Sequence, residues 1–187
     1  VQPLVAGMDT DIPADMQVNI RRVFTYSDML VNSSWILKRI FKEKYRRSLY
    51  LQERPYKKEI LFEVPSGAFF IIKTDIFKKI DFFDEDTFLY GEELMLGYKL
   101  KSLGKIFLLV PKFKVLHYQG KSTQAHKNKT TKITENYAMN SKIIYFRKYL
   151  KVNTLMICIY KLSYFLSLKS QKIENGIIKI FKSICRK

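Results

Sequence analysis

The sequence predicts an α/β fold followed by a mainly helical, lysine-rich segment. Between Leu61 and Tyr118, apolar runs with strand character alternate with segments whose apolar residues recur at helical spacing. Of the 187 residues, 47% are hydrophobic, which is enough for one domain with a core of its own. Beyond Thr123 the chain turns polar and then helical. We therefore expect an α/β unit over residues 1–125 and a helical, basic tail over residues 126–187.

The first part of the chain predicts a strand, a loop and a helix. VQPLVA (1–6) predicts a buried strand, and the turn formers of residues 7–18 indicate a loop. Residues 26–50 are basic and aromatic, and four apolar residues recur there at helical spacing: Trp35, Ile36, Ile40 and Phe41. This pattern is typical of an amphipathic helix with a solvated basic face, and contact with a membrane or an acceptor is the alternative. Because the chain opens on a core strand and not on Met, we expect it to be part of a longer polypeptide.

The densest pattern comes next. GAFFIIK (67–73) predicts an inner strand, and Thr74 is expected to cap a short helix, DIFKKI. FFDEDTFLY (82–90) predicts an aromatic loop. A second helix is expected from Glu92, with acidic residues in its first turn, lysines in its last turn and Gly104 directly after its end.

Two strands and the tail complete the prediction. KIFLLV (105–110) reads as a strand closed by Pro111, and KVLHYQGKS (114–122) as a second, short strand. TLMICIYKLSYFLSL (154–168) is strongly apolar, but Lys161 interrupts it and it falls short of the ~20 residues that span a bilayer. An interfacial amphipathic helix is favoured there, and a helix packed into the core is the alternative.

The charge balance indicates an anionic partner. The chain has 34 lysines and arginines against 17 acidic residues, a formal net charge of +17. Such an excess attracts nucleic acid, a phosphate-bearing substrate or the acidic leaflet of a membrane. The lysines are dispersed and form no known nucleic-acid signature, so no nucleic-acid partner is expected. Cys158 and Cys185 have no metal-ligand spacing and suggest no disulfide framework, which favours a reducing compartment.

Two adjacent carboxylates are the first candidate for chemistry. Glu92 and Glu93 follow Gly91 at a loop-to-helix junction beside the predicted sheet, where α/β proteins commonly place ligands. A like-charged neighbour raises a carboxyl pKa, whereas the helix dipole lowers it. A carboxylate whose pKa is lifted toward neutrality can act as a general base. The alternative is that both acids only stabilise the start of the helix.

The order of these segments resembles the C-terminal half of family 2 glycosyltransferases, in particular the rhamnosyl- and galactosyltransferase-like enzymes of bacterial surface polysaccharides. SGAFFIIK (66–73), the aromatic-Asp-Glu loop, the YGEE turn (90–93) that opens a helix, and VLHYQGKS (115–122) follow one another as in that family. The resemblance implies a partial GT-A fold, with a mixed sheet flanked by helices and a nucleotide-sugar at the sheet's C-terminal edge. It also implies that the donor-binding half is missing from this chain.

The resemblance assigns roles to individual residues. Glu93 takes the position of the catalytic base, where the family usually has Asp, and Glu92 precedes it. Met95 stands where the family often has a second Asp. The acceptor side is expected at Ser66, Gly67, Tyr90 and Gly91. The donor diphosphate is expected near His117, Gly120, Lys121 and Ser122.

The resemblance further implies a divalent metal, Mg or Mn, with His117 as a candidate ligand. The strings Asp9-Thr10-Asp11 and Asp84-Glu85-Asp86 have the Asp-x-Asp form. Neither is expected to be the metal motif, because the first lies in a turn-rich loop and the second coincides with the aromatic loop.

The expected function is inverting sugar transfer from a nucleotide-sugar to a saccharide or lipid-linked acceptor in surface polysaccharide synthesis. The expected location is cytoplasmic, peripheral on the inner face of the cell membrane. Two alternatives stay open: a basic membrane- or nucleic-acid-binding module without chemistry, and an inactive remnant of an enzyme.

Overall fold

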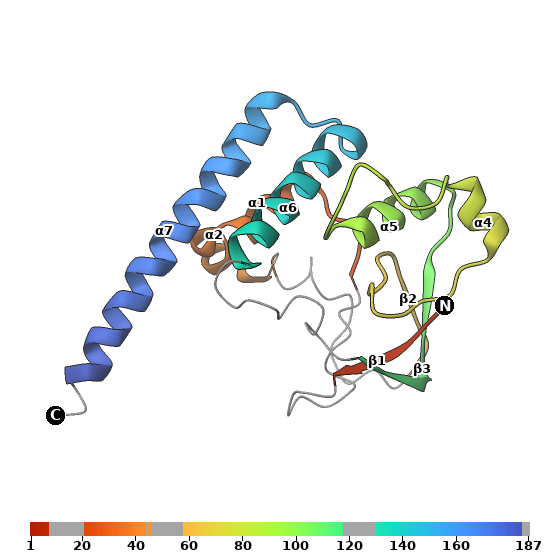
Figure 1. The fold of residues 1–187 in the computed structure, drawn as a ribbon, viewed down its shortest axis with the longest axis horizontal. Coiled ribbons are helices and arrows are strands. Elements are labelled where there is room, and N and C mark those ends of the chain that lie inside the picture. The colour runs from red at the N-terminus through yellow and green to blue at the C-terminus, as the bar shows by residue number, and fades with distance from the viewer. Residues whose placement is uncertain (8–20, 44, 46–57, 118–129, 185–187) are drawn as a thin grey trace.

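The computed structural model describes residues 1–7, 21–43, 45, 58–117 and 130–184, which form a mixed α/β fold as expected (Figure 1). The strands are β1 (Gln2–Gly7), β2 (Ile60–Phe62) and β3 (Phe107–His117). The helices are α1 (Tyr26–Ser33), α2 (Trp35–Ile40), α4 (Thr74–Lys79), α5 (Glu92–Ser102), α6 (Thr130–Ile144), the π-helix η2 (Tyr145–Tyr149) and α7 (Thr154–Ile184).

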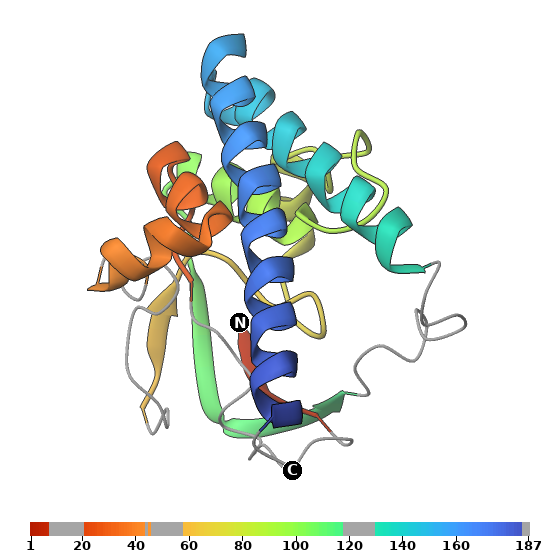
Figure 2. The ribbon, with the colours of Figure 1, turned by 90° about the vertical axis from the view of Figure 1, so that its left-hand side faces the viewer.

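The three described strands form one mixed sheet in the order β1-β3-β2. β1 runs parallel to β3, and β2 runs antiparallel to it. β3 is a single long strand that curves under the helices (Figure 2). The prediction of two separate strands at 105–110 and 114–122 is therefore wrong, because one strand continues through Pro111. Residues 118–122 lie outside the described residues. The pairing with β1 shifts register at Pro3/Leu4, next to this proline, which has no N–H to give to the ladder.

The strand predicted at residues 67–73 is not formed. Gly67 and Ala68 lie in a turn, and the residues after them belong to no strand. Ala68, Phe70 and Ile72 pack against the core, whereas the alternate residues are exposed. Two backbone hydrogen bonds join this segment to the start of the chain. The Ile71 N–H donates to the Val1 carbonyl, and the Val1 amino group donates to the Ile71 carbonyl. Burial therefore alternates along residues 68–73 as the sequence predicts. This alternation alone does not determine whether a neighbouring strand is present to pair with the segment.

The first short helix begins at the predicted place with a different cap. α4 starts at Thr74, its N-cap is Lys73, and no side chain bonds the cap, so the predicted capping role of Thr74 is wrong. The second helix agrees with the prediction. α5 begins at Glu92, and Gly104 follows its end with a φ of +66°, where a glycine is favoured.

Helix α5 lies between two hydrophobic clusters. Leu96 and Leu100 pack against Phe107 and Leu109 of the sheet. Met95 packs into a second cluster. Its other buried members come from the chain before α1 (Val23, Phe24), from α1 (Met29), from the segment after β2 (Val64) and from the tail (Tyr145, Phe146, Ile157, Tyr160). α5 closely approaches the backbone directly after β2, since a Cβ at Gly97 would lie 2.6 Å from the Glu63 carbonyl oxygen. The position of α5, and of the two glutamates at its start, is therefore fixed from both sides.

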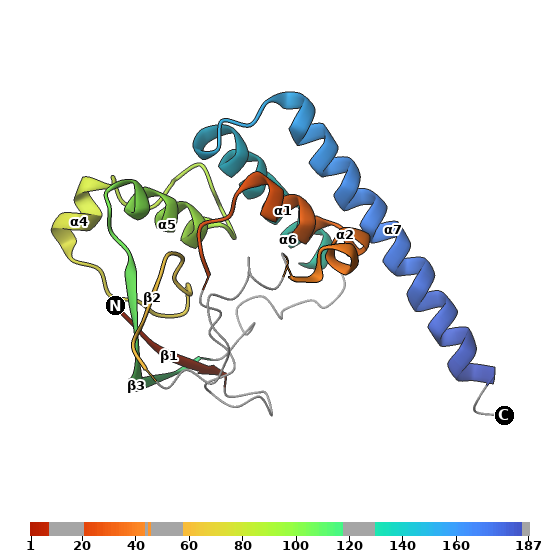
Figure 3. The ribbon, with the colours of Figure 1, turned by 180° about the vertical axis from the view of Figure 1, so that it is seen from behind.

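The helical tail packs against the first helices. α1, α2 and α6 lie between α7 and the sheet (Figures 1 and 3). The Tyr26 hydroxyl donates to the Met156 carbonyl at 2.8 Å, and the backbone N–H of Trp35 donates to Ser167 Oγ at 2.9 Å. Across the described residues, no helix combines the length and apolar content needed to cross a membrane.

Candidate functional site

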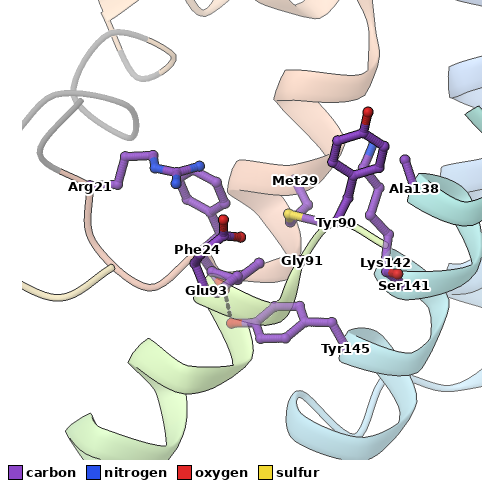
Figure 4. A pocket seen from close by; sticks show the side chains of 11 residues that line it. Arg21, Phe24, Met29, Tyr90, Gly91, Glu93, Ala138, Ser141, Lys142 and Tyr145 are labelled. Atoms are coloured by element: carbon purple, nitrogen blue, oxygen red, sulfur yellow. Dashed lines mark hydrogen bonds between the residues drawn. The ribbon is translucent and has the colours of Figure 1, made fainter. Parts of the chain in front are cut away.

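A pocket of about 330 Å³ lies at the N-terminal end of α5, against α1, α6 and η2 (Figure 4). Its polar lining includes Arg21, Tyr90, Glu93, Lys142 and Tyr145. Phe24, Met29 and Leu94 contribute apolar surface. A concave, largely apolar site with a few convergent polar groups is the usual form of a small-molecule site.

Glu93 is the carboxylate of this pocket. Burial raises its pKa, and the charge of neighbouring Glu92 raises it further. The N–H groups of Glu93 and Gly67 and the positive charge of Arg21 act in the opposite direction, but the pKa stays above its usual value. Glu93 is therefore a stronger proton acceptor, when ionised, than an ordinary surface glutamate.

A strained turn sets the position of Glu93. Tyr90 and Gly91 both have positive φ angles, +65° and +91°. The left-handed conformation costs a non-glycine residue such as Tyr90 about 1–2 kcal/mol. Ser141 of α6 donates a hydrogen bond to the Leu89 carbonyl at 3.1 Å and thereby ties the turn to the tail. The predicted acceptor residues Tyr90 and Gly91 thus lie in the pocket wall beside Glu93.

Gly67 lies directly against Glu93, although the two are far apart in the sequence. A Cβ at Gly67 would come within 2.1 Å of Glu93 Oε1, closer than any real contact. Ser66, the preceding residue, donates its N–H to the buried Gln2 side chain at 2.8 Å. Gly67 therefore leaves the space that the Glu93 carboxyl group occupies, whereas Ser66 bonds to β1.

Glu92 is not a lining residue of the pocket. Its Oε2 is buried and has no hydrogen-bond partner within the described part of the chain. Its effect on the site is electrostatic, because its charge raises the pKa of Glu93.

The predicted donor side falls largely outside the described residues. Gly120, Lys121 and Ser122 are not described. His117 is the last residue of β3, opposite Gly7 of β1, and only its backbone is described. The structure therefore relates Glu93 to the predicted acceptor residues and leaves the donor residues as a prediction.

The two Asp-x-Asp strings do not supply a described metal site. Asp9 and Asp11 lie outside the described residues. Asp84 accepts hydrogen bonds from Lys148 and from the Tyr149 hydroxyl, and Asp86 accepts one from Lys148 at 2.7 Å. Within the described residues, no three His, Cys, Asp or Glu side chains are grouped so that they could hold a metal ion. The side chain of His117, the candidate ligand, is not described, so the divalent metal that the resemblance implies stays a prediction.

Sequence reasoning missed the cations of the pocket. Burial lowers the pKa of Arg21, and the charge of Glu93 opposes that effect. The Arg21 Nε is buried without a partner among the described residues, and Nη2 makes one long hydrogen bond to the Pro65 carbonyl, 3.5 Å. Burial and nearby Lys38 lower the pKa of Lys142. No local pattern distinguishes these two residues in a chain with 34 basic residues.

Comparisons of this chain with protein-family models, with curated proteins and with solved structures found no match.

Proposed function

We propose that this chain carries the acceptor-binding and catalytic side of an inverting glycosyltransferase of GT-A-like architecture. It transfers a sugar from a nucleotide-sugar to a saccharide or lipid-linked acceptor in surface polysaccharide synthesis. The observation that supports this most is the placement of Glu93, a carboxylate with a raised pKa, in a pocket wall beside Gly67, Tyr90 and Gly91. The resemblance assigns these four residues, together with Glu92 and Ser66, to the base and its acceptor.

The proposed step is a single displacement. An acceptor hydroxyl enters the pocket, and the ionised Glu93 takes its proton. The hydroxyl oxygen forms a bond to the anomeric carbon of the donor sugar while the bond from that carbon to the nucleoside diphosphate breaks. The diphosphate leaves with the bonding electron pair. Glu93 performs this role best above its raised pKa, where it is ionised and still basic.

The pocket also offers groups that hold an acceptor. The Tyr90 ring provides an aromatic surface for a sugar face, and Lys142 provides a cation near it (Figure 4). The positive charge of Arg21 acts on Glu93 and favours its ionised form. The proposal therefore assigns acceptor binding to residues of both the α/β unit and the tail.

The proposed location is peripheral, on the inner face of the cell membrane. A lipid-linked acceptor would be met there, and a chain with a net charge of +17 is attracted to the anionic lipids of that leaflet.

A second candidate is a basic binding module without chemistry, which the same net charge of +17 favours. A transfer assay separates the two. The protein is incubated with a panel of nucleotide-sugars and saccharide acceptors, and nucleoside diphosphate release and the acceptor mass are measured. Sugar transfer to an acceptor supports the enzyme. Absence of transfer with every donor, together with binding to anionic surfaces, would favour the binding module.

A further inference from the structure

Helix α7 is apolar on two opposite faces. Ile157 and Tyr160 are 2% and 1% exposed and pack into the cluster around Phe24. Five other apolar side chains of α7 are between 46% and 70% exposed: Leu155, Ile159, Leu162, Phe165 and Leu166. One face of the helix is therefore covered by the protein, and an apolar face is left open.

Four of these exposed residues, Leu155, Ile159, Leu162 and Leu166, form one stripe, which we call the α7 stripe. Leu155, Ile159, Leu162 and Leu166 are separated by four, three and four positions, so they line a single side of a helix with 3.6 residues per turn. Ile157 and Tyr160 lie roughly half a turn away, on the packed side. Scattered exposed apolar residues are ordinary, but a contiguous apolar patch of this kind marks an interaction surface.

The place of α7 in the molecule keeps this helix accessible. α7 runs along one edge of the fold, and its C-terminal half extends past α1 and α2 (Figures 1 and 3). Seen from that side, α7 lies in front of the other elements (Figure 2).

We propose that the α7 stripe docks onto the surface of an anionic lipid bilayer, with α7 lying in the plane of the interface. The charge of the helix favours this occupant. α7 contains Lys161, Lys169, Lys172, Lys179 and Lys182 against the single acid Glu174. Lysines beside an apolar helix face pair with anionic headgroups while the apolar face enters the acyl boundary.

The described lysines support this arrangement. Lys161 and Lys169 are exposed, and the Lys169 ammonium group lies 4.7 Å from the centre of the Phe165 ring. A long lysine stem can cover an apolar ring while its charge stays in water. A second copy of the chain is the less favourable occupant, because it would bring together two molecules that each carry a net charge of +17.

The inference deepens the peripheral location proposed above and rests on it, but vesicle binding requires no sugar donor. Co-sedimentation is measured with phosphatidylcholine vesicles and with vesicles that also contain phosphatidylglycerol. The wild-type chain is expected to bind the anionic vesicles, and added salt is expected to weaken this binding. Leu162→Glu/Leu166→Glu is expected to weaken it at least tenfold. Both positions are more than half exposed, so the fold is expected to tolerate the change, which circular dichroism checks.

A matched variant controls for charge. Leu103→Glu/Ile106→Glu makes the same chemical change at two exposed apolar residues between α5 and β3. It is expected to bind anionic vesicles within about threefold of wild type. Equal weakening by both double variants would overturn the assignment to α7, as would a wild-type chain that does not bind anionic vesicles. A lipid-free dimer that the α7 variant dissociates would identify a second copy as the occupant instead.

A probe on α7 reports the inserted face directly. Cys158 is exposed on this helix and can carry a polarity-sensitive fluorophore once Cys185 is replaced by Ser. The emission is expected to shift to the blue with anionic vesicles. The emission of the same probe at Ser102→Cys, with both native cysteines replaced by Ser, is expected to stay unchanged.

The two proposals fail separately. Absence of sugar transfer with vesicle binding intact would overturn only the proposed enzyme. Sugar transfer without vesicle binding would overturn only the docking surface.

Discussion

Three features meet at Glu93: partial burial, a like-charged neighbour and a glycine that leaves room for its carboxyl group. The first two raise its pKa, so the folded protein favours the protonated side chain. A structural first-turn acid would instead be stabilised in its charged form by the helix dipole. A raised pKa is what the proposed base requires, and it is opposite to the shift that the helix dipole alone would cause.

Replacing Glu93 by Gln is expected to stabilise the fold at pH 7. Because the folded pKa is raised, the favourable contribution of the protonated acid is complete below the unfolded value of about 4.3 and is lost as the pH rises through the folded pKa. Glu93→Gln should therefore raise the melting temperature at pH 7, by about 2–4 °C for each kcal/mol of stabilisation in a chain of this size. The difference should vanish near pH 4, which calorimetry across pH can check. A variant that is less stable than wild type at pH 7 would contradict the raised pKa.

Gly67→Ala tests the contact between Gly67 and the carboxyl group. The new Cβ would meet Glu93 Oε1 at 2.1 Å, and the flexible end of Glu93 would turn away. Stability should change by less than about 1 kcal/mol, whereas transfer should fall about 10²-fold, as expected when a reacting group is displaced by about 1 Å. Gly97→Ala is the matched control, because its Cβ meets the Glu63 backbone and should cost about 1–3 kcal/mol. Transfer at the wild-type rate by Gly67→Ala would remove this contact from the mechanism.

Among the elements, local patterns predicted helices better than strands. The dipole-compatible charges and Gly104 mark both ends of α5 within the sequence itself. A strand needs a partner that the local sequence does not specify, and residues 67–73 have the alternation without the neighbour. Pro111 was expected to end a strand, but β3 continues through it because the irregular pairing with β1 lies at that point.

The aromatic loop is tied to η2 by a buried carboxylate. Burial alone would raise the pKa of Asp84, but hydrogen bonds from Tyr149 and Lys148 hold it below its usual value. The resulting stabilisation is present above the unfolded pKa of about 3.9 and is lost as the pH falls through the lower folded pKa. Asp84→Asn should cost about 2 kcal/mol at pH 7 in urea unfolding. Asp86→Asn, at a side chain that is 60% exposed, should cost under about 1 kcal/mol. Equal costs for the two variants would contradict the anchoring role of Asp84.

At the level of the whole molecule, the tail and the α/β unit share a core. Phe146 and Tyr160 of the tail are buried with Val23 and Phe24. Phe146→Ala should therefore destabilise the entire chain by about 3–5 kcal/mol. Fluorescence of Trp35, the single tryptophan, and far-ultraviolet circular dichroism should follow one common unfolding transition. Two separate transitions would show that residues 1–125 and 126–187 unfold as independent units.

This shared core explains how far the site could be predicted. The local motif around Glu93 points to Tyr90 and Gly91, and the resemblance adds Gly67. Lys142 and Tyr145 enter the pocket only because α6 and η2 fold back over α5, a long-range contact without a local signature. Arg21 follows a loop of turn formers and resembles the other basic residues of the chain. The sequence therefore indicates the carboxylate and its turn, and the fold adds the cations around them.

The most direct measurement is the rate of sugar transfer by Glu93→Gln compared with Glu92→Gln, each folded and assayed with the same donor and acceptor. Loss of the base at Glu93 should lower the rate at least ~10²-fold, the range typical of a general base. Glu92→Gln should retain most of the rate, because Glu92 acts on the pocket only through its charge. Transfer by Glu93→Gln at the wild-type rate would show that another group takes the proton.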